Sequence, residues 1–338
     1  MTFALKNLQE IKILFHGQKT KIAIFSHKSP DGDAVGSGLA LKKYLEDKGH
    51  EVVFVLPNKF PDFLAWMPES DKILFSDKNK KEVLKRIEGT TIAVFADLNS
   101  FSRLGSIENH VRKFFSNKIK IVIDHHTDIE NEFDLLYWDV AVSSTSELIY
   151  DFIVASGDAD KITKQIAESL YVGIITDTGS LSYSCNNEST YVALAHFFKL
   201  KIDGEAIHQK VYSTYSEDRI KLLGFSLNQK LKVFPEKKAA YIVLTNDELK
   251  KFNHKTGDTE GLVNYTLSIN SIQFGALLTE KKNYINISLR SEGEIDVNQI
   301  ARKFLNGGGH KNAAGADYYG TLGDACKLIE DIINNKLK

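Results

Sequence analysis

Acidic and imidazole side chains gather in four short segments of the chain, each beside an apolar run. The segments carry His27, Asp31 and Asp33 in "HKSPDGDAVGS", Asp97 in "ADLNSFSRLG", Asp124, His125 and His126 in "IDHH", and Asp177 in "GIITDTGS". Carboxylates brought together in a partly buried site repel one another strongly. Divalent cations placed among them would remove that repulsion. The chemistry that these residue types indicate is therefore metal binding.

The elements that must position these side chains are short buried strands. The segments 21–27, 51–56, 71–75, 91–97 and 119–126 are apolar and β-branched, and helical patterns separate them. This alternation predicts an α/β fold with a mostly parallel sheet covered by helices on both faces. The carboxyl ends of parallel strands share one edge, where ligands bind in such sheets. Three clusters follow predicted strands and should converge there, and Asp177, after a helical or mixed apolar run, could reach the same edge.

Each cluster alone also has an ordinary structural explanation. "DGD" is usually a surface turn, Asp97 could cap a helix, and "DHH" could be a solvated loop. Their conjunction at strand ends favours a metal site instead. A ligand set of carboxylates with some imidazole and no thiolate favours Mn²⁺, with Mg²⁺ or Co²⁺ as alternatives. Four aspartates and two histidines exceed what one ion needs, so we expect two ions bridged by a carboxylate.

The predicted secondary structure changes twice along the rest of the chain. Residues 145–200 are mainly helical, and 201–226 are predicted to form a helical connector. Residues 227–338 predict a smaller α+β domain with two pairs of strands, the helix "DVNQIARKFL", a glycine-rich loop "NGGGHKNAAG" and a closing helix. We therefore expect a first domain over 1–200, the connector over 201–226 and a second domain over 227–338.

The composition excludes several classes of protein. The 338 residues have a net charge of −1 and no basic tail, which disfavours long nucleic acid held along a charged stripe. Two cysteines provide neither a disulfide framework nor a thiolate metal site. Apolar residues near the N-terminus, from Leu5 to Phe15, recur at helical spacing, which predicts an amphipathic helix rather than a signal peptide. No apolar run approaches membrane-spanning length, so we expect a cytoplasmic protein.

The four motifs, in their order along the chain, resemble those of the DHH phosphoesterase superfamily, and "NGGGHKNAAG" resembles the glycine-rich motif of its companion DHHA1 domain. The resemblance spans nearly the whole chain. In length and in its lack of extra domains, the chain resembles the stand-alone bifunctional oligoribonuclease and pAp phosphatase branch of the superfamily. The longer RecJ-type exonucleases and the membrane-bound cyclic-dinucleotide phosphodiesterases are less similar.

The resemblance implies a set of roles for the motif residues. One Mn²⁺ would be held by His27, Asp31 and Asp97, and a second by Asp33, Asp97, His125 and Asp177, with Asp97 bridging the two. His126 would then be free to contact the scissile phosphate, either stabilising the transition state or protonating the leaving group. Asp124 would orient a histidine.

Substrate-binding residues are expected mainly in the second domain. Arg290 could clamp a phosphate, and the backbone of Gly307, Gly308, Gly309 and His310 could approach an anion. The resemblance places these residues across a cleft from the metals, which would favour short substrates. Arg103 is a weaker candidate, as is "SSTSE" (143–147), for which helix capping is at least as good an explanation.

The function implied is a Mn²⁺-dependent phosphodiesterase that hydrolyses very short oligoribonucleotides from one end and also removes the 3′-phosphate of pAp. Cleavage of linear pApA or cyclic di-AMP is the alternative within enzymes, and a catalytically silent nucleotide-binding protein is the alternative outside them. We expect neither long duplex nucleic acid nor a membrane as partner. The sequence allows a homodimer without indicating one.

Overall fold

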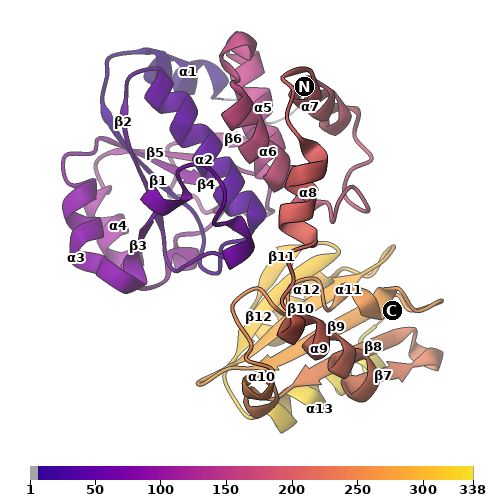
Figure 1. The fold of residues 1–338 in the computed structure, drawn as a ribbon. Helices are drawn as coiled ribbons and strands as arrows, with labels where there is room; N and C mark the ends of the chain where they lie inside the picture. Colours follow the sequence, from indigo (N-terminus) through magenta and orange to yellow (C-terminus); the bar gives the residue numbers. More distant parts are fainter. Residues whose placement is uncertain (1–6, 338) are drawn as a thin grey trace. The chain divides into compact units, whose positions relative to one another are not determined.

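The computed structural model describes residues 7–337, so Leu5 lies outside the described residues. The chain divides into two compact units, the first ending at Thr214 and the second beginning at Tyr215. Figure 1 shows one sheet in each unit, with helices packed against it.

The sheet of the first unit is wholly parallel, as the sequence predicts. Its strands are β1 (Lys21–Phe25), β2 (Glu51–Leu56), β3 (Leu74–Phe75), β4 (Ile92–Ala96), β5 (Ile119–Asp124) and β6 (Leu135–Trp138). They lie in the order β3-β2-β1-β4-β5-β6 with parallel neighbours throughout. The strand predicted over 71–75 is shorter than expected, because Ser70–Lys72 form a 3-10 turn. Strand β6 was not predicted from the sequence.

Helices cover both faces of this sheet. They are α1 (Leu8–His16), α2 (Gly32–Asp47), α3 (Ser76–Ile87), α4 (Glu108–Phe114), α5 (Thr145–Ala155), α6 (Lys164–Asp177), α7 (Glu188–Lys199) and α8 (Gly204–Tyr212). Alternate residues of β1 face opposite ways: Ile24 packs in the core with α2, α5 and α6, whereas Phe25 packs in the core with α3 and α4. Strands buried on both faces explain the continuous apolar runs in the sequence.

Helices α2 and α6 approach each other closely in the first core. Gly36 makes this possible, since a Cβ there would lie 2.4 Å from the carbonyl oxygen of Ser169. The contact matters for function because α2 begins, and α6 ends, at the sheet edge that carries the acidic motifs (Figure 1).

The second unit is built on a mixed sheet in the order β11-β12-β10-β9-β8-β7, antiparallel except between β8 and β9. Its strands are β7 (Leu231–Phe234), β8 (Ala239–Leu244), β9 (Phe274–Glu280), β10 (Ile285–Ser291), β11 (Gly308–His310) and β12 (Ala313–Tyr318). Its helices are α9 (Glu217–Phe225), α10 (Asn246–Lys251), α11 (Asn264–Leu267), α12 (Val297–Leu305) and α13 (Leu322–Asn335).

The glycine-rich segment is not the loop that the sequence predicts. It forms an antiparallel hairpin in which Gly308, Gly309 and His310 pair with Gly315, Ala314 and Ala313. Glycine lowers the intrinsic preference for a strand, so the pattern resembled a loop, but pairing within the sheet overrides that preference.

The segment 201–226 is helical and belongs to both units. Helix α8 contributes Ile207 and Val211 to the core of the first unit. Helix α9 contributes Leu222 to a core of the second unit, together with Ile242 and Leu277 of the sheet.

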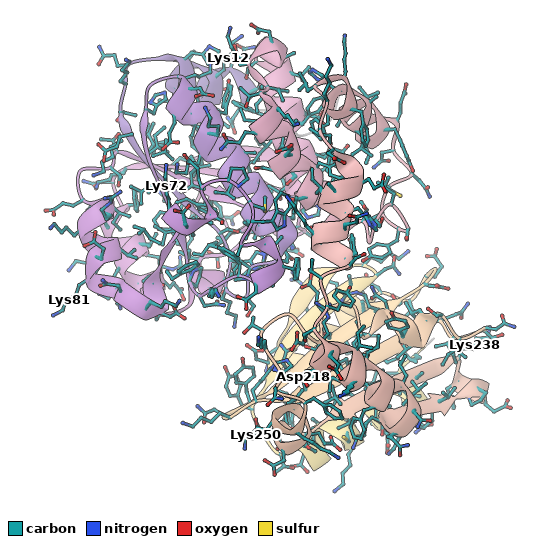
Figure 2. All side chains as sticks on the ribbon, in the orientation of Figure 1. Lys12, Lys72, Lys81, Asp218, Lys238 and Lys250 are labelled. Atoms are coloured by element: carbon teal, nitrogen blue, oxygen red, sulfur yellow. The ribbon has the colours of Figure 1, made fainter. Side chains whose placement is uncertain are left out.

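Two surface properties bear on possible partners. No helix within residues 7–337 combines the length and apolar character needed to cross a membrane. Lys12, Lys72 and Lys81 lie on three different elements of the first unit (Figure 2).

Candidate metal centre

The acidic motifs of the first unit meet where the strand order reverses. Strands β1 and β4 are neighbours at the centre of the sheet, and the chain proceeds outward from them in opposite directions. Ligands bind at such switch points, beyond the carboxyl ends of the strands. His27 follows β1, Asp97 follows β4 directly, and Asp124 is the last residue of β5.

Asp97 lies at the middle of the cluster and is only 2% exposed. Its Oδ2 is 3.1 Å from His27 Nε2, and its Oδ1 is 3.4 Å from His126 Nδ1 and 3.9 Å from His125 Nε2. Burial raises the pKa of Asp97, but the hydrogen bond with His27 and the neighbouring imidazole charges outweigh burial and hold that pKa well below its usual range.

The "DGD" turn divides its two carboxylates between two environments. Asp31 caps α2, because its Oδ1 accepts from the amides of Asp33 (3.1 Å) and Ala34 (3.0 Å). The same oxygen lies 3.9 Å from His27 Nε2. Asp33 is 1% exposed, so it is not part of a solvated turn. Burial and the charge of Asp97 raise the pKa of Asp33 well above its usual range.

A second group of potential ligands lies around His125. Its Nε2 is 3.2 Å from Asp177 Oδ2 and 3.9 Å from Asp33 Oδ2. Asp177 is the last residue of α6, so a helix rather than a strand brings it to the sheet edge. Two sets of three ligand atoms therefore form separately: one from His27, Asp31 and Asp97, the other from Asp33, His125 and Asp177.

Asp124 fixes the orientation of His126. Its Oδ1 accepts from the backbone amide of His126 at 2.9 Å and lies 2.8 Å from the ring Nδ1. Trp138 at the end of β6 donates from Nε1 to the carbonyl oxygen of His126 at 2.6 Å. Burial raises the pKa of Asp124, but the charge of His126 and their hydrogen bond outweigh it and lower the pKa. The distances would also allow Asp97, Asp124 and His126 to hold a cation.

The donor set fits divalent cations. Three carboxylates, from Asp33, Asp97 and Asp124, are at most 2% exposed, and the charge of Asp97 acts to raise the pKa of each of the other two. Asp124 Oδ2 is buried and has no hydrogen-bond partner within residues 7–337. Buried charge of one sign is costly without compensation, and hard oxygen ligands with some imidazole suit Mn²⁺, Mg²⁺ or Co²⁺.

The glycine-rich segment and Arg290 lie near one another in the second unit. Arg290 on β10 is in register with Ala313 at the start of β12, beside the hairpin that contains the glycines. Its Nη1 donates to the carbonyl oxygen of Leu289 at 3.0 Å.

Close packing and hydrogen bonding within the second unit also explain why glycines occur in this segment. A Cβ on Gly307 would lie 2.1 Å from the carbonyl oxygen of Gly315. The amide of Gly309 donates to Asn298 Oδ1 at 3.0 Å, and the amide of Gly307 donates to the carbonyl oxygen of Ala301 at 3.0 Å. These hydrogen bonds occupy two of the amides that were expected to face an anion.

Both units match known families over most of their length. The DHH family, N-terminal domain, matches residues 21–174, and the DHHA1 domain matches residues 236–335. A crystal structure of an exopolyphosphatase-related protein from Bacteroides fragilis is 38% identical, with a TM-score of 0.89, over 97% of this chain and 95% of that one. The chain belongs to the DHH/DHHA1 family.

Curated relatives in the DHH/DHHA1 family have similar length. The probable bifunctional oligoribonuclease and PAP phosphatase NrnA of Streptococcus mutans is 29% identical, over 88% of this chain and 89% of that protein. NrnA of Bacillus subtilis is 27% identical, over 92% of this chain and 93% of that protein. RecJ of Thermus thermophilus, solved in complex with Mn²⁺, shares the fold with a TM-score of 0.55 at 14% identity, over 98% of this chain and 55% of that one.

Arg103 of this DHH domain lies close to the metal centre. Its carbonyl oxygen accepts from the amide of Lys28 at 2.8 Å, and its guanidinium donates to Asn99 Oδ1 at 3.2 Å. Burial and the charge of Arg103 act to lower the pKa of His27, but Asp97 and Asp31 outweigh them and raise it.

Two further features of the DHH domain contact the motif residues, and the sequence did not predict these contacts. Trp138, on the unpredicted strand β6, gave no signal. The "SSTSE" segment is predicted either to cap a helix or to contact substrate, and Ser144 does cap α5 by accepting from the amide of Glu147 at 3.0 Å. Its neighbours Thr145 and Ser146 also donate from their amides to Asp33. The signal available was a run of five polar residues, 143–147, at the start of an otherwise apolar helix.

Proposed function

We propose that this chain is a metal-dependent phosphoesterase that hydrolyses very short oligoribonucleotides from one end and removes the 3′-phosphate of pAp. The observation that carries the proposal is that two sets of three potential ligands, one of which contains Asp97, form at the switch point of the parallel sheet. The proposed substrates are supported by two relatives named as oligoribonuclease and PAP phosphatase, which match this chain over about nine-tenths of its length.

The proposed cofactor is a pair of divalent cations, with Mn²⁺ preferred and Mg²⁺ or Co²⁺ accepted. One would be held by His27, Asp31 and Asp97, and the other by Asp33, Asp97, His125 and Asp177. Such cations supply charge neutralisation at phosphoryl oxygens and lower the pKa of bound water. Asp97 is proposed to serve both, since each of its oxygens faces a different histidine.

His126 is proposed to act on the phosphate. Asp124 Oδ1 lies 2.8 Å from its Nδ1, and we propose that the His126 ring carries a proton to the leaving oxygen or a positive charge beside the phosphate. Asp124 would keep the ring in one orientation, as carboxylates hydrogen-bonded to functional histidines do.

Substrate binding is proposed for Arg103 in the DHH domain and for Arg290, His310 and the glycines 307–309 in the DHHA1 domain. A guanidinium can bind a phosphate through two hydrogen bonds.

A relative supports the alternative of cyclic di-AMP or its linear product as substrate. The cyclic-di-AMP phosphodiesterase PdeA of Listeria monocytogenes is 26% identical over 312 residues, but the match covers only 45% of that protein. The shorter NrnA proteins match along nearly all of their length, which favours the oligoribonuclease proposal.

A substrate panel separates these functions. We would compare kcat/KM for pAp, a dinucleotide, a five-nucleotide RNA and cyclic di-AMP at one Mn²⁺ concentration, with EDTA and Asp97→Ala as controls. The proposal expects pAp and the short RNAs to be preferred and both controls to abolish turnover. Preference for cyclic di-AMP supports the alternative. A protein that binds nucleotides but hydrolyses neither these substrates nor bis-(p-nitrophenyl) phosphate is a silent binder.

A further inference from the structure

The start of α5 is an unusually buried polar segment. Ser143 is 1% exposed, and Ser144, Thr145, Ser146 and Glu147 are fully buried. Burying polar groups costs free energy unless each finds a hydrogen-bond partner. The partners of this segment therefore show what it is held against.

The first turn of α5 holds one carboxylate from each set of potential metal ligands. Thr145 N donates to Asp33 Oδ2 at 2.7 Å, and Ser146 N donates to Asp33 Oδ1 at 2.9 Å. Thr145 Oγ1 donates to Asp97 Oδ1 at 3.2 Å. Amides at a helix start have no partner within the helix and carry its positive end, so they stabilise a carboxylate. The position of this turn sets the positions of Asp33 and Asp97.

Glu147 holds that turn in place from the other side. Its Oε2 accepts from Ser143 N at 3.0 Å, from the Ser143 hydroxyl, and from Thr190 Oγ1 at 2.7 Å. Its Oε1 accepts from Ser189 Oγ at 2.6 Å. Ser189 and Thr190 lie in the first turn of α7, so one carboxylate fastens the start of α5 to the start of α7.

We propose that Glu147 is a positioning residue of the metal centre, which fixes the first turn of α5 so that its amides and the Thr145 hydroxyl hold Asp33 and Asp97 in place. This inference rests on the proposed metal-dependent function. The carboxylate of Glu147 accepts hydrogen bonds from Ser143, Ser189 and Thr190, and none of these three residues is a candidate ligand. Its effect on metal binding is therefore transmitted through α5.

The test measures Mn²⁺ affinity of the full, metal-stripped chain by isothermal titration calorimetry, with the melting temperature of each variant recorded. Glu147→Ala removes all four acceptor contacts and is expected to weaken Mn²⁺ binding roughly 10- to 100-fold, as loss of groups that orient ligands commonly does. Glu147→Gln keeps the shape and can still accept from Ser143 and Thr190, so it should recover most of the affinity.

Leu194→Ala is the matched control, because Leu194 is an apolar residue buried in α7 at 6% exposure, and its side chain cannot take part in this hydrogen-bond network. It should lower the melting temperature yet bind Mn²⁺ as the wild type does. If Glu147→Ala also binds as the wild type does, Glu147 only stabilises the fold and the inference is overturned. If Glu147→Ala does not fold, the double variant Ser189→Ala/Thr190→Val takes its place with the same two outcomes. Wild-type protein that binds no Mn²⁺ overturns the proposed function and this inference together.

Discussion

Asp97 combines an uncommon backbone conformation with a buried carboxylate side chain. Its backbone is in the left-handed region, with φ of 57°, which is uncommon for a residue other than glycine. The same turn directs its carboxylate between His27 and His126, where it is held ionised. Strain of this kind, of the order of 1 kcal/mol or more, persists where the surrounding structure compensates for it, often at functional sites.

His126 is the residue whose substitution should separate catalysis from metal binding. We expect His126→Ala to lower kcat roughly 10²- to 10⁴-fold, the usual contribution of a general acid, while Mn²⁺ affinity changes little. Steady-state kinetics and calorimetric titration measure the two quantities. His110→Ala, at an exposed position of α4, is the control. Parallel loss of activity and metal would mean that His126 is a metal ligand, which its distance to Asp97 also permits.

Asp151 should give the free energy of unfolding a distinct pH dependence. Burial, with the charges of Glu147 and Asp139, raises the pKa of Asp151 to about 7. The native state therefore binds more protons than the unfolded state between about pH 4 and 7, and stability falls as pH rises through that range. Asp151→Asn should match the wild type near pH 4 and be more stable at pH 8, by up to roughly 4 kcal/mol.

Urea unfolding at a series of pH values measures the difference in free energy of unfolding between the wild type and Asp151→Asn. The contributions of the other titrating groups cancel in this difference. Asp71→Asn, at an exposed position, is the control and should give no such trend. A constant difference between pH 4 and 8 would show that Asp151 is ionised throughout.

At the scale of elements, the sequence predicted what repeats locally and missed what depends on distant contacts. β1, β2, β4 and β5 are continuous apolar runs, so they and the motif residues after them were predictable. β11 contains two glycines and owes its extended form to pairing with β12. The hydrogen bond from the Thr145 amide in α5 to Asp33 joins residues 112 positions apart, and no local sequence pattern indicates such a pairing.

Gly173 on α6 tests whether close helix packing positions the metal centre. A Cβ there would lie 1.9 Å from Ser146 Oγ and 2.6 Å from Asp33 Oδ1. We expect Gly173→Ala to destabilise the protein by about 1–3 kcal/mol, as overpacking of a core does, and to weaken Mn²⁺ binding. Denaturant unfolding and calorimetric titration provide the measurements.

Gly224→Ala is the control for this substitution, because Gly224 lies in α9 and a Cβ added there would point into open space. Alanine favours helix over glycine, so this variant should be as stable as the wild type or up to about 1 kcal/mol more stable. Equal behaviour of the two variants would mean that α6 can move away from α5 without consequence.

At the scale of the whole molecule, the chain combines two units that carry different candidate residues. The ligands proposed for the two cations all lie in the first unit, after β1, β4 and β5 and at the ends of α2 and α6. The candidate anion-binding residues Arg290 and His310 lie in the DHHA1 domain. Each unit can be identified from its own sequence motifs. The residues that hydrogen-bond to those motifs, such as Trp138 to His126, are found only in the folded structure.

This division predicts where metal stabilises the protein. A ligand that binds only the native state stabilises it by about 2.7 kcal/mol at 100 times its Kd. Mn²⁺ at that excess should slow amide hydrogen exchange in β1, β4 and β5, because the proposed cations would link the residues that follow these strands, and in the first turn of α5, which is hydrogen-bonded to Asp33 and Asp97. Exchange in β8, β9 and β10 should stay unchanged, since none of the proposed ligands lies on them. Ca²⁺ is a useful comparison, because its preference for more oxygen ligands at longer distances suits the imidazoles poorly. Protection that spreads equally over both units would contradict a metal centre confined to the DHH domain.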